Sequence, residues 1–275
     1  MPYQAFVLRC CSAHMNKVRL LSMDFDGTLI RDWAPPPFPA ELVHALDRLR
    51  AHGAAIAVNT GRTINLVEQG LKYTGFPIRP DFALTTEREV FRWTDSGWED
   101  FGEWNARCLE DHGILYEKIG YLLLDIEAYV KSETGARVYR EEERVSGIVA
   151  RTNPEMDRIT RFIDERRQAF PEVAYQRNAI YLRFCHVAYH KGAALAELQR
   201  LIGVSKDETF AAGDNFNDLP MLDGVFARFV ACPSNAIEEV KAIVRKQGGF
   251  VAAQDSGAGV ADALHHFFRH LIRVP

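Results

Sequence analysis

Two aspartates stand two residues apart at the end of an apolar run in the segment LSMDFDGTLI. Asp24 and Asp26 close a predicted buried strand, and Gly27 and Thr28 then mark a sharp turn. In an extended chain, residues two apart point the same way, so both carboxylates can face one atom. Carboxylates this close repel each other and need a cation, a proton or a catalytic role.

Further reactive side chains stand at later element ends. Thr60 lies in the segment NTGR after a second apolar run, Lys191 begins a predicted helix, and Asp214 ends another apolar run. The segment after Asp214 adds three polar residues: Asn215, Asn217 and Asp218. Each signal alone is explained as well by a turn, a helix cap or a loop end. In an open parallel sheet, however, ligands bind outside the carboxyl ends of the strands. Together these residues predict a site for Mg²⁺ and a phosphate group.

The elements that must position these groups alternate between strand and helix in the first third of the chain. Apolar runs predict strands at 18–25, 54–61 and 80–86, and helical spacing predicts helices at 40–53 and 62–75. This alternation is typical of an α/β fold with a doubly wound parallel sheet. It places the carboxyl ends of consecutive strands at one edge.

The alternation then breaks and later returns. The middle block, 87–187, shows short strand-like runs and long helical runs, which predict an inserted α+β domain. Residues 17–86 and 188–275 are predicted to form one core around it, and 1–16 are expected to be an N-terminal extension.

Composition limits the functional class. The chain has 275 residues, 47% hydrophobic residues and a net charge of −4, so no basic surface for nucleic acid is expected. The five cysteines form no metal-binding spacing and are interpreted as free thiols in a reducing compartment, which favours a cytoplasmic location. No run is long enough to span a membrane. The sequence leaves a monomer and a homodimer equally open.

The segments DFDGTL, NTGR, KG and GDNFNDLPML occur in this order and resemble the four motifs of the haloacid dehalogenase superfamily of phosphatases. The insertion after the third strand resembles the C2-cap branch, which includes the Cof-type and sucrose-phosphatase-like enzymes. The segment GAGVADAL resembles the closing segment of that branch. The resemblance implies a Rossmann-like core with a C2-type cap, and it is weak across the insertion.

The resemblance also implies roles for the residues at the strand ends. Asp24 would be the nucleophile that forms an aspartyl-phosphate, and Asp26 the general acid and base. Mg²⁺ would be held by Asp24, the main-chain carbonyl of Asp26, and Asp214. Asp218 would act through water or hold Lys191 in place. The phosphate and the rest of the substrate would be bound by a wider set of residues: Thr60, Gly61, Arg62, Lys191, Asn215 and Asn217.

Two departures from the family pattern concern substrate choice. Where that branch often has Asn-Gly after the third strand, this chain reads TTEREV. Glu87 and Arg88 therefore either face the substrate or are solvated turn charges, and we favour the second interpretation. In the strand before Lys191, Arg183 stands where the branch often has other residues and is able to bind a second anionic group.

The expected function is Mg²⁺-dependent hydrolysis of a small phosphorylated metabolite, with a sugar phosphate as one candidate. One alternative is a phosphotransferase or mutase that passes the phosphoryl group to a sugar hydroxyl. Another is a phosphate-binding protein without turnover, although an acid two residues from the nucleophile argues against pure binding.

Overall fold

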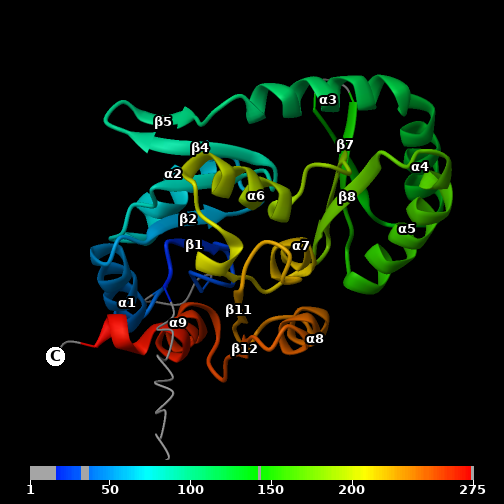
Figure 1. The fold of residues 1–275 in the computed structure, drawn as a ribbon. Coiled ribbons are helices and arrows are strands. Elements are labelled where there is room, and N and C mark those ends of the chain that lie inside the picture. Colours follow the sequence, from blue (N-terminus) through cyan, green and yellow to red (C-terminus); the bar gives the residue numbers. More distant parts are fainter. Residues whose placement is uncertain (1–16, 32–36, 142–143, 274–275) are drawn as a thin grey trace, which may run out of the picture.

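The computed structural model describes residues 17–31, 37–141 and 144–273. The predicted N-terminal extension at 1–16 lies outside these residues. The described chain forms two sheets with helices packed on them (Figure 1). Among the described residues, no helix has both the length and the apolar character needed to cross a membrane.

The larger sheet has eight strands in the order β12-β11-β10-β1-β2-β3-β4-β5. Their bounds are β1 Leu20–Met23, β2 Ala55–Asn59, β3 Phe82–Thr85, β4 Glu89–Thr94, β5 Gly97–Asp100, β10 Thr209–Ala212, β11 Phe229–Cys232 and β12 Phe250–Val251. Strand β1 lies in the centre, parallel to both neighbours, and Leu20 is in register with Ala55 on one side and Thr209 on the other. The predicted α/β fold is therefore confirmed.

Both faces of this sheet are covered by helices. One face packs on α1 Ala40–Ala51, α2 Ile64–Thr74 and α9 Ser256–Ile272, and the other on α6 Lys191–Ile202, α7 Leu219–Leu222 and α8 Glu238–Lys246. Side chains of a strand alternate between the faces, so Leu21 and Met23 of β1 join the first layer and Leu20 joins the second. All three are fully buried, and each contributes about 1.5–3 kcal/mol by leaving water.

The hairpin of β4 and β5 differs from the sequence-based expectation. It was expected inside the insertion at 87–187, but β4 pairs antiparallel with β3 and extends the eight-stranded sheet. Leu84 of β3 lies opposite Val90 of β4, and both are fully buried. The sequence shows two short strands here but does not show which sheet they join, because pairing depends on the turn at 86–88.

The second sheet has four antiparallel strands in the order β6-β7-β9-β8. Their bounds are β6 Arg137–Glu141, β7 Arg144–Val149, β8 Val173–Asn178 and β9 Tyr181–His186. The helices of this part are α3 Trp104–Lys118, α4 Gly120–Glu133 and α5 Asn153–Arg166. Leu182 and Phe184 of β9 point into an apolar cluster shared with α4 and α5. The intervening Arg183 therefore lies on the opposite face.

Candidate active site

The carboxyl ends of β1 and β10 bring two of the predicted aspartates together. Asp24 directly follows β1, and its backbone N–H donates to the carbonyl of Ala212 at the end of β10. The turn after Asp24 requires glycine, because Gly27 has a φ of +77° and a Cβ there would lie 2.7 Å from Asp214 Oδ2. Thr28 closes the same turn by donating its hydroxyl to Asp214 Oδ1 at 3.1 Å.

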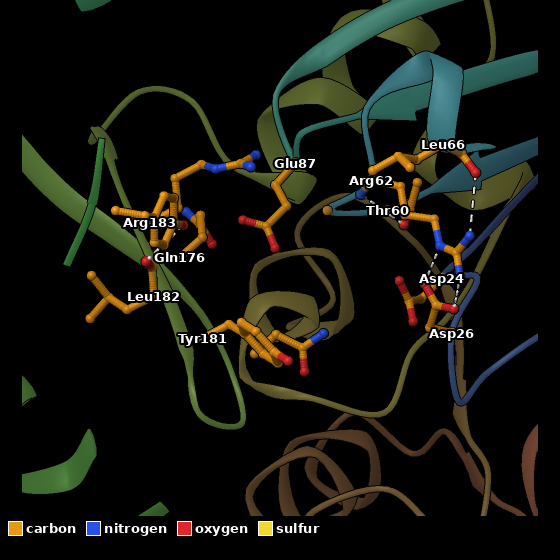
Figure 2. A pocket seen from close by; sticks show the side chains of 13 residues that line it. Asp24, Asp26, Thr60, Arg62, Leu66, Glu87, Gln176, Tyr181, Leu182 and Arg183 are labelled. Atoms are coloured by element: carbon orange, nitrogen blue, oxygen red, sulfur yellow. Dashed lines mark hydrogen bonds and ion pairs between the residues drawn. The ribbon is translucent and has the colours of Figure 1, made fainter. Parts of the chain in front are cut away.

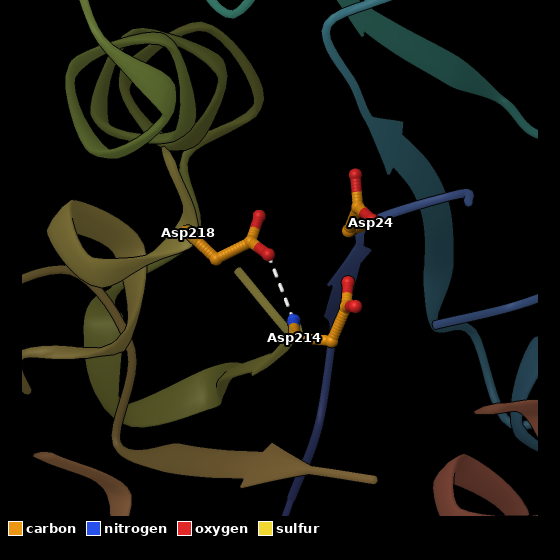
Figure 3. Close-up of side chains that lie close together, drawn as sticks. All are labelled: Asp24, Asp214 and Asp218. Carbon is orange, nitrogen blue, oxygen red and sulfur yellow. Dashed lines mark hydrogen bonds between the residues drawn. The ribbon is translucent and has the colours of Figure 1, made fainter. Parts of the chain in front are cut away.

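A third carboxylate completes a cluster (Figure 3). One ligand atom from each of Asp24, Asp214 and Asp218 lies within 4.8 Å of the others. The Oδ2 atom of Asp218 accepts the backbone N–H groups of Asp214 at 2.8 Å and of Asn215 at 2.9 Å. Asp218 therefore fixes the loop that carries Asp214.

Lys191 lies against this cluster and is completely buried. Its Nζ donates to Asp24 Oδ1 and to Asp218 Oδ1, both at 2.6 Å. Burial opposes the charge on the amine, but Asp218 and Asp24 outweigh this effect and raise the pKa of Lys191 above its ordinary value. Lys191 is the first residue of α6, and the helix is capped by His190, whose ring accepts the N–H of Ala193.

The surroundings of Asp24 and Asp214 disfavour the ionised form of both carboxyl groups. Burial raises the pKa of Asp24 well above its ordinary value, Lys191 opposes this, and Asp218 and Asp214 add to it. Burial and then the Asp218 charge raise the pKa of Asp214 to about 7. A single lysine therefore does not balance three clustered carboxylates, and the donor set consists of the hard oxygen atoms that Mg²⁺ prefers.

Asp26 lies outside this cluster and faces Arg62. The guanidinium donates from Nε to Asp26 Oδ2 at 2.6 Å and from Nη2 to Asp26 Oδ1 at 2.5 Å. Arg62 also lies over the ring of Phe25, 5.0 Å from its centroid. The Oγ1 of Thr60 accepts the N–H of Arg62, so the segment NTGR positions the arginine that orients Asp26.

These groups line one cavity of about 520 Å³ between the two sheets (Figure 2). Its core wall consists of Asp24, Asp26, Thr60, Gly61, Arg62, Leu66 and Glu87. Its other wall consists of Tyr139, Gln176, Asn178, Tyr181, Leu182 and Arg183 from the four-stranded sheet. The structure thus places Arg183, a candidate for binding a second anionic group, at the cavity.

Three predicted substrate-binding residues do not line this cavity: Lys191, which bonds Asp24 and Asp218, and two asparagines of the loop after β10. Asn215 accepts the N–H of Ala179 at 3.2 Å, which ties its loop to the turn between β8 and β9. Asn217 donates its Nδ2 to Glu87 Oε1 at 2.7 Å. The Oδ1 of Asn215 and the Nδ2 of Asn217 are therefore used within the protein, whereas the buried Oδ1 of Asn217 has no hydrogen-bond partner in the described chain.

The favoured interpretation of Glu87 as a solvated turn charge is wrong. Its side chain lines the cavity, and the residue is only 5% exposed. Burial raises the pKa of Glu87, and the charge of Lys191 opposes this shift. The signal in the sequence is that Glu87 stands two residues after β3, at the same edge of the sheet as Asp24 and Thr60.

Comparison with known proteins gives consistent results. The model of the family described as haloacid dehalogenase-like hydrolase matches residues 127–264. A Bacillus subtilis (strain 168) protein named "Putative phosphatase YxeH" is 26% identical over 279 residues, covering 90% of this chain and 97% of that one.

Two solved structures share the fold. Sucrose-phosphatase from Synechocystis sp. PCC6803, solved with sucrose and phosphate, has a TM-score of 0.67 and 20% identity, covering 91% of this chain and 98% of that one. BT4131, described as a subclass IIB sugar phosphatase, has a TM-score of 0.57 and 18% identity, covering 91% and 99%. The matched family segment covers half of this chain, so the chain belongs to the haloacid dehalogenase-like hydrolases and is an enzyme of that family.

Proposed function

We propose that the protein is a Mg²⁺-dependent phosphomonoester hydrolase that acts on a small phosphorylated metabolite through an aspartyl-phosphate. The observation that carries this proposal is the buried contact of Lys191 with both Asp24 and Asp218, beside Asp214 and at the end of the cavity. A nucleophilic carboxylate and an anionic phosphate repel each other, and this arrangement supplies the positive charge that offsets the repulsion.

In the first step, an oxygen of Asp24 forms a bond to phosphorus while the ester bond to the leaving oxygen breaks. Asp26 must be protonated for this step, which requires at least one of its two hydrogen bonds from Arg62 to open, and it then delivers that proton to the leaving oxygen. In the second step, water attacks the phosphorus and transfers its proton to Asp26. The bond between phosphorus and Asp24 breaks, and phosphate leaves. Arg62 orients the Asp26 carboxylate through its two hydrogen bonds, and Thr60 lies at the cavity wall where phosphoryl oxygens would bind.

The three-carboxylate cluster fits a divalent cation. Asp24, the main-chain carbonyl of Asp26, and Asp214 would hold Mg²⁺, which when bound would offset the charge of the carboxylates and the phosphate. Both oxygens of Asp218 are already hydrogen-bonded, to Lys191 and to the loop amides. This supports a role for Asp218 in positioning Lys191 rather than in direct metal contact.

We further propose that the four-stranded sheet and its helices act as a cap that excludes bulk water from the cavity and selects the leaving group. The predicted core segments, 17–86 and 188–275, would then carry the chemistry. The polar cavity wall of this sheet is consistent with a sugar phosphate as substrate. The cytoplasmic location and the monomeric or homodimeric state stay predictions from the sequence.

The test is hydrolysis of p-nitrophenyl phosphate with Mg²⁺ and with EDTA. We expect turnover only with Mg²⁺, and we expect Asp24→Asn to reduce it at least about a thousandfold because the amide is a poor nucleophile. The matched control is Asp47→Asn, an exposed aspartate on α1, which should retain wild-type turnover. Normal turnover by Asp24→Asn would refute its assignment as the nucleophile.

A further inference from the structure

Glu87 is held at the cavity in an unfavourable backbone conformation. Thr86 and Glu87 have φ values of +48° and +67°, in the left-handed region that side chains other than glycine, asparagine and aspartate seldom adopt. The backbone N–H of Glu87 donates to the carbonyl of Thr60, which ties the turn to the segment NTGR. Such strain persists only where the surrounding structure enforces it, and it is concentrated at functional sites.

The Glu87 carboxylate is buried without a direct ionic partner. Its one side-chain hydrogen bond in the described chain comes from Asn217, and no lysine or arginine of the described residues forms an ion pair with it. Lys191 is already used by Asp24 and Asp218. A buried carboxylate destabilises the fold unless hydrogen bonds satisfy it. The cavity wall is therefore missing hydrogen-bond donors that a ligand is able to supply.

The facing wall offers the complementary group. Cross-strand register aligns Tyr139, Gly147, Arg183 and Gln176 in one row across the four-stranded sheet. Gly147 leaves room for the tyrosine, since a Cβ there would collide with the Tyr139 hydroxyl. The Nε of Arg183 is buried and has no hydrogen-bond partner in the described chain. Figure 2 shows Glu87 between this wall and the residues around Asp24.

We propose that Glu87 determines substrate specificity by accepting hydrogen bonds from hydroxyl groups of the leaving group, while Arg183 donates to oxygen atoms of the same group. The substrate class is then the monophosphate esters of polyhydroxylated compounds, and apolar alcohols are disfavoured. This inference rests on the phosphatase function proposed above. It assigns part of the leaving-group selection to the core, through a residue that follows β3.

The experiment compares two phosphate esters of equal chain length, sorbitol 6-phosphate and hexyl phosphate. The measured quantity is the ratio of their kcat/KM values in the wild type and in Glu87→Gln, which keeps the size and the acceptor for Asn217 but removes the charge. We expect the preference for the hydroxylated ester to fall roughly tenfold or more, because hydrogen bonds to a charged acceptor are lost. Glu89→Gln is the matched control, since Glu89 stands two residues after Glu87, accepts the hydroxyl of Thr85 and does not line the cavity.

The outcomes separate the two proposals. If Glu87→Gln is folded by its thermal unfolding curve and its ratio equals that of the wild type, the specificity role is wrong, even if both esters are hydrolysed more slowly. An equal fall of the ratio in Glu89→Gln also overturns it. If the wild type hydrolyses neither these esters nor p-nitrophenyl phosphate, the phosphatase function fails. Calorimetric affinities for the same two esters then test Glu87 by the same ratio without turnover.

Discussion

The charged side chains at the cavity form two groups whose hydrogen bonding differs. In the group around Asp24, Lys191 bonds both Asp24 and Asp218, and the second oxygen of Asp218 accepts two backbone amides. Around Glu87 and on the wall of the four-stranded sheet, buried polar atoms lack partners, as the Nε of Arg183 does. The difference suggests that the first group is built for a fixed reaction and that the second is completed by the substrate.

The largest expected effect breaks the core network. Lys191→Met keeps the side-chain volume but leaves Asp24 and Asp218 buried beside each other without their cation. We expect a loss of about 3–5 kcal/mol in the free energy of unfolding, measured in urea, together with loss of turnover. Lys206→Met, at an exposed lysine, is the control and should lie within about 0.5 kcal/mol of the wild type. A loss below about 1 kcal/mol at Lys191 would contradict the buried network.

A smaller effect is expected where the inserted segment joins the core. His112 of α3 is buried, with Nδ1 2.7 Å from the carbonyl of Cys108 and Nε2 accepting the N–H of His186 at 3.1 Å. The neutral ring with its proton on Nδ1 fits both contacts, and a second proton would face an N–H donor. Burial and then the charge of Arg88 lower the pKa of His112 to about 4, from an ordinary value of 6.5.

The direction in which stability changes with pH follows from this lowered pKa of His112. The stability that His112 contributes is fully present above pH 6.5 and is lost as the pH falls toward 4. The difference corresponds to about 3 kcal/mol. We expect His112→Asn to flatten the pH dependence of the urea midpoint in this window, while His270→Asn, at an exposed position, should follow the wild type. A steep dependence that survives in His112→Asn would show that another group is responsible.

The smallest expected effect concerns the cavity wall that the four-stranded sheet forms. Arg183→Gln removes a cation whose Nε is unpaired, so the free energy of unfolding should change by less than about 1 kcal/mol. The KM for sorbitol 6-phosphate should rise about tenfold, because a charged donor to the leaving group is lost. Arg137→Gln is the control, because Arg137 is an exposed residue of β6 that does not line the cavity. A large loss in the free energy of unfolding of Arg183→Gln would show that Arg183, like Lys191, is satisfied within the fold. The difference between the two groups of charged side chains would then not hold.

The two groups also differ in how well the sequence predicts their positions. Asp24, Thr60, Lys191 and Asp214 each stand at an element end with a recognisable local pattern, and the parallel sheet brings those ends together. That these residues converge at one edge of the sheet could therefore be predicted from the sequence, although Lys191 and Asp24 are 167 positions apart.

The sequence does not show that Glu87 is buried, because a charged residue after a strand has the same pattern whether it faces water or a cavity. The positive φ values at Thr86 and Glu87, which turn the side chain inward, are set by the surrounding fold. The row that contains Arg183 depends on strand register, and a shift by one residue would place it on the opposite face. Such facts are not local properties of the sequence.

The central position of β1 has a consequence for synthesis on the ribosome. Its partner on one side, β10, begins at Thr209, opposite Leu20, so the insertion must be translated before the central pairing forms. At about 5–20 residues per second, this delay lasts on the order of ten seconds. During that time one edge of β1 is unpaired, and the non-local pairing makes folding slow. The nascent chain therefore gains its lysine–aspartate contact, and with it any activity, only late in translation.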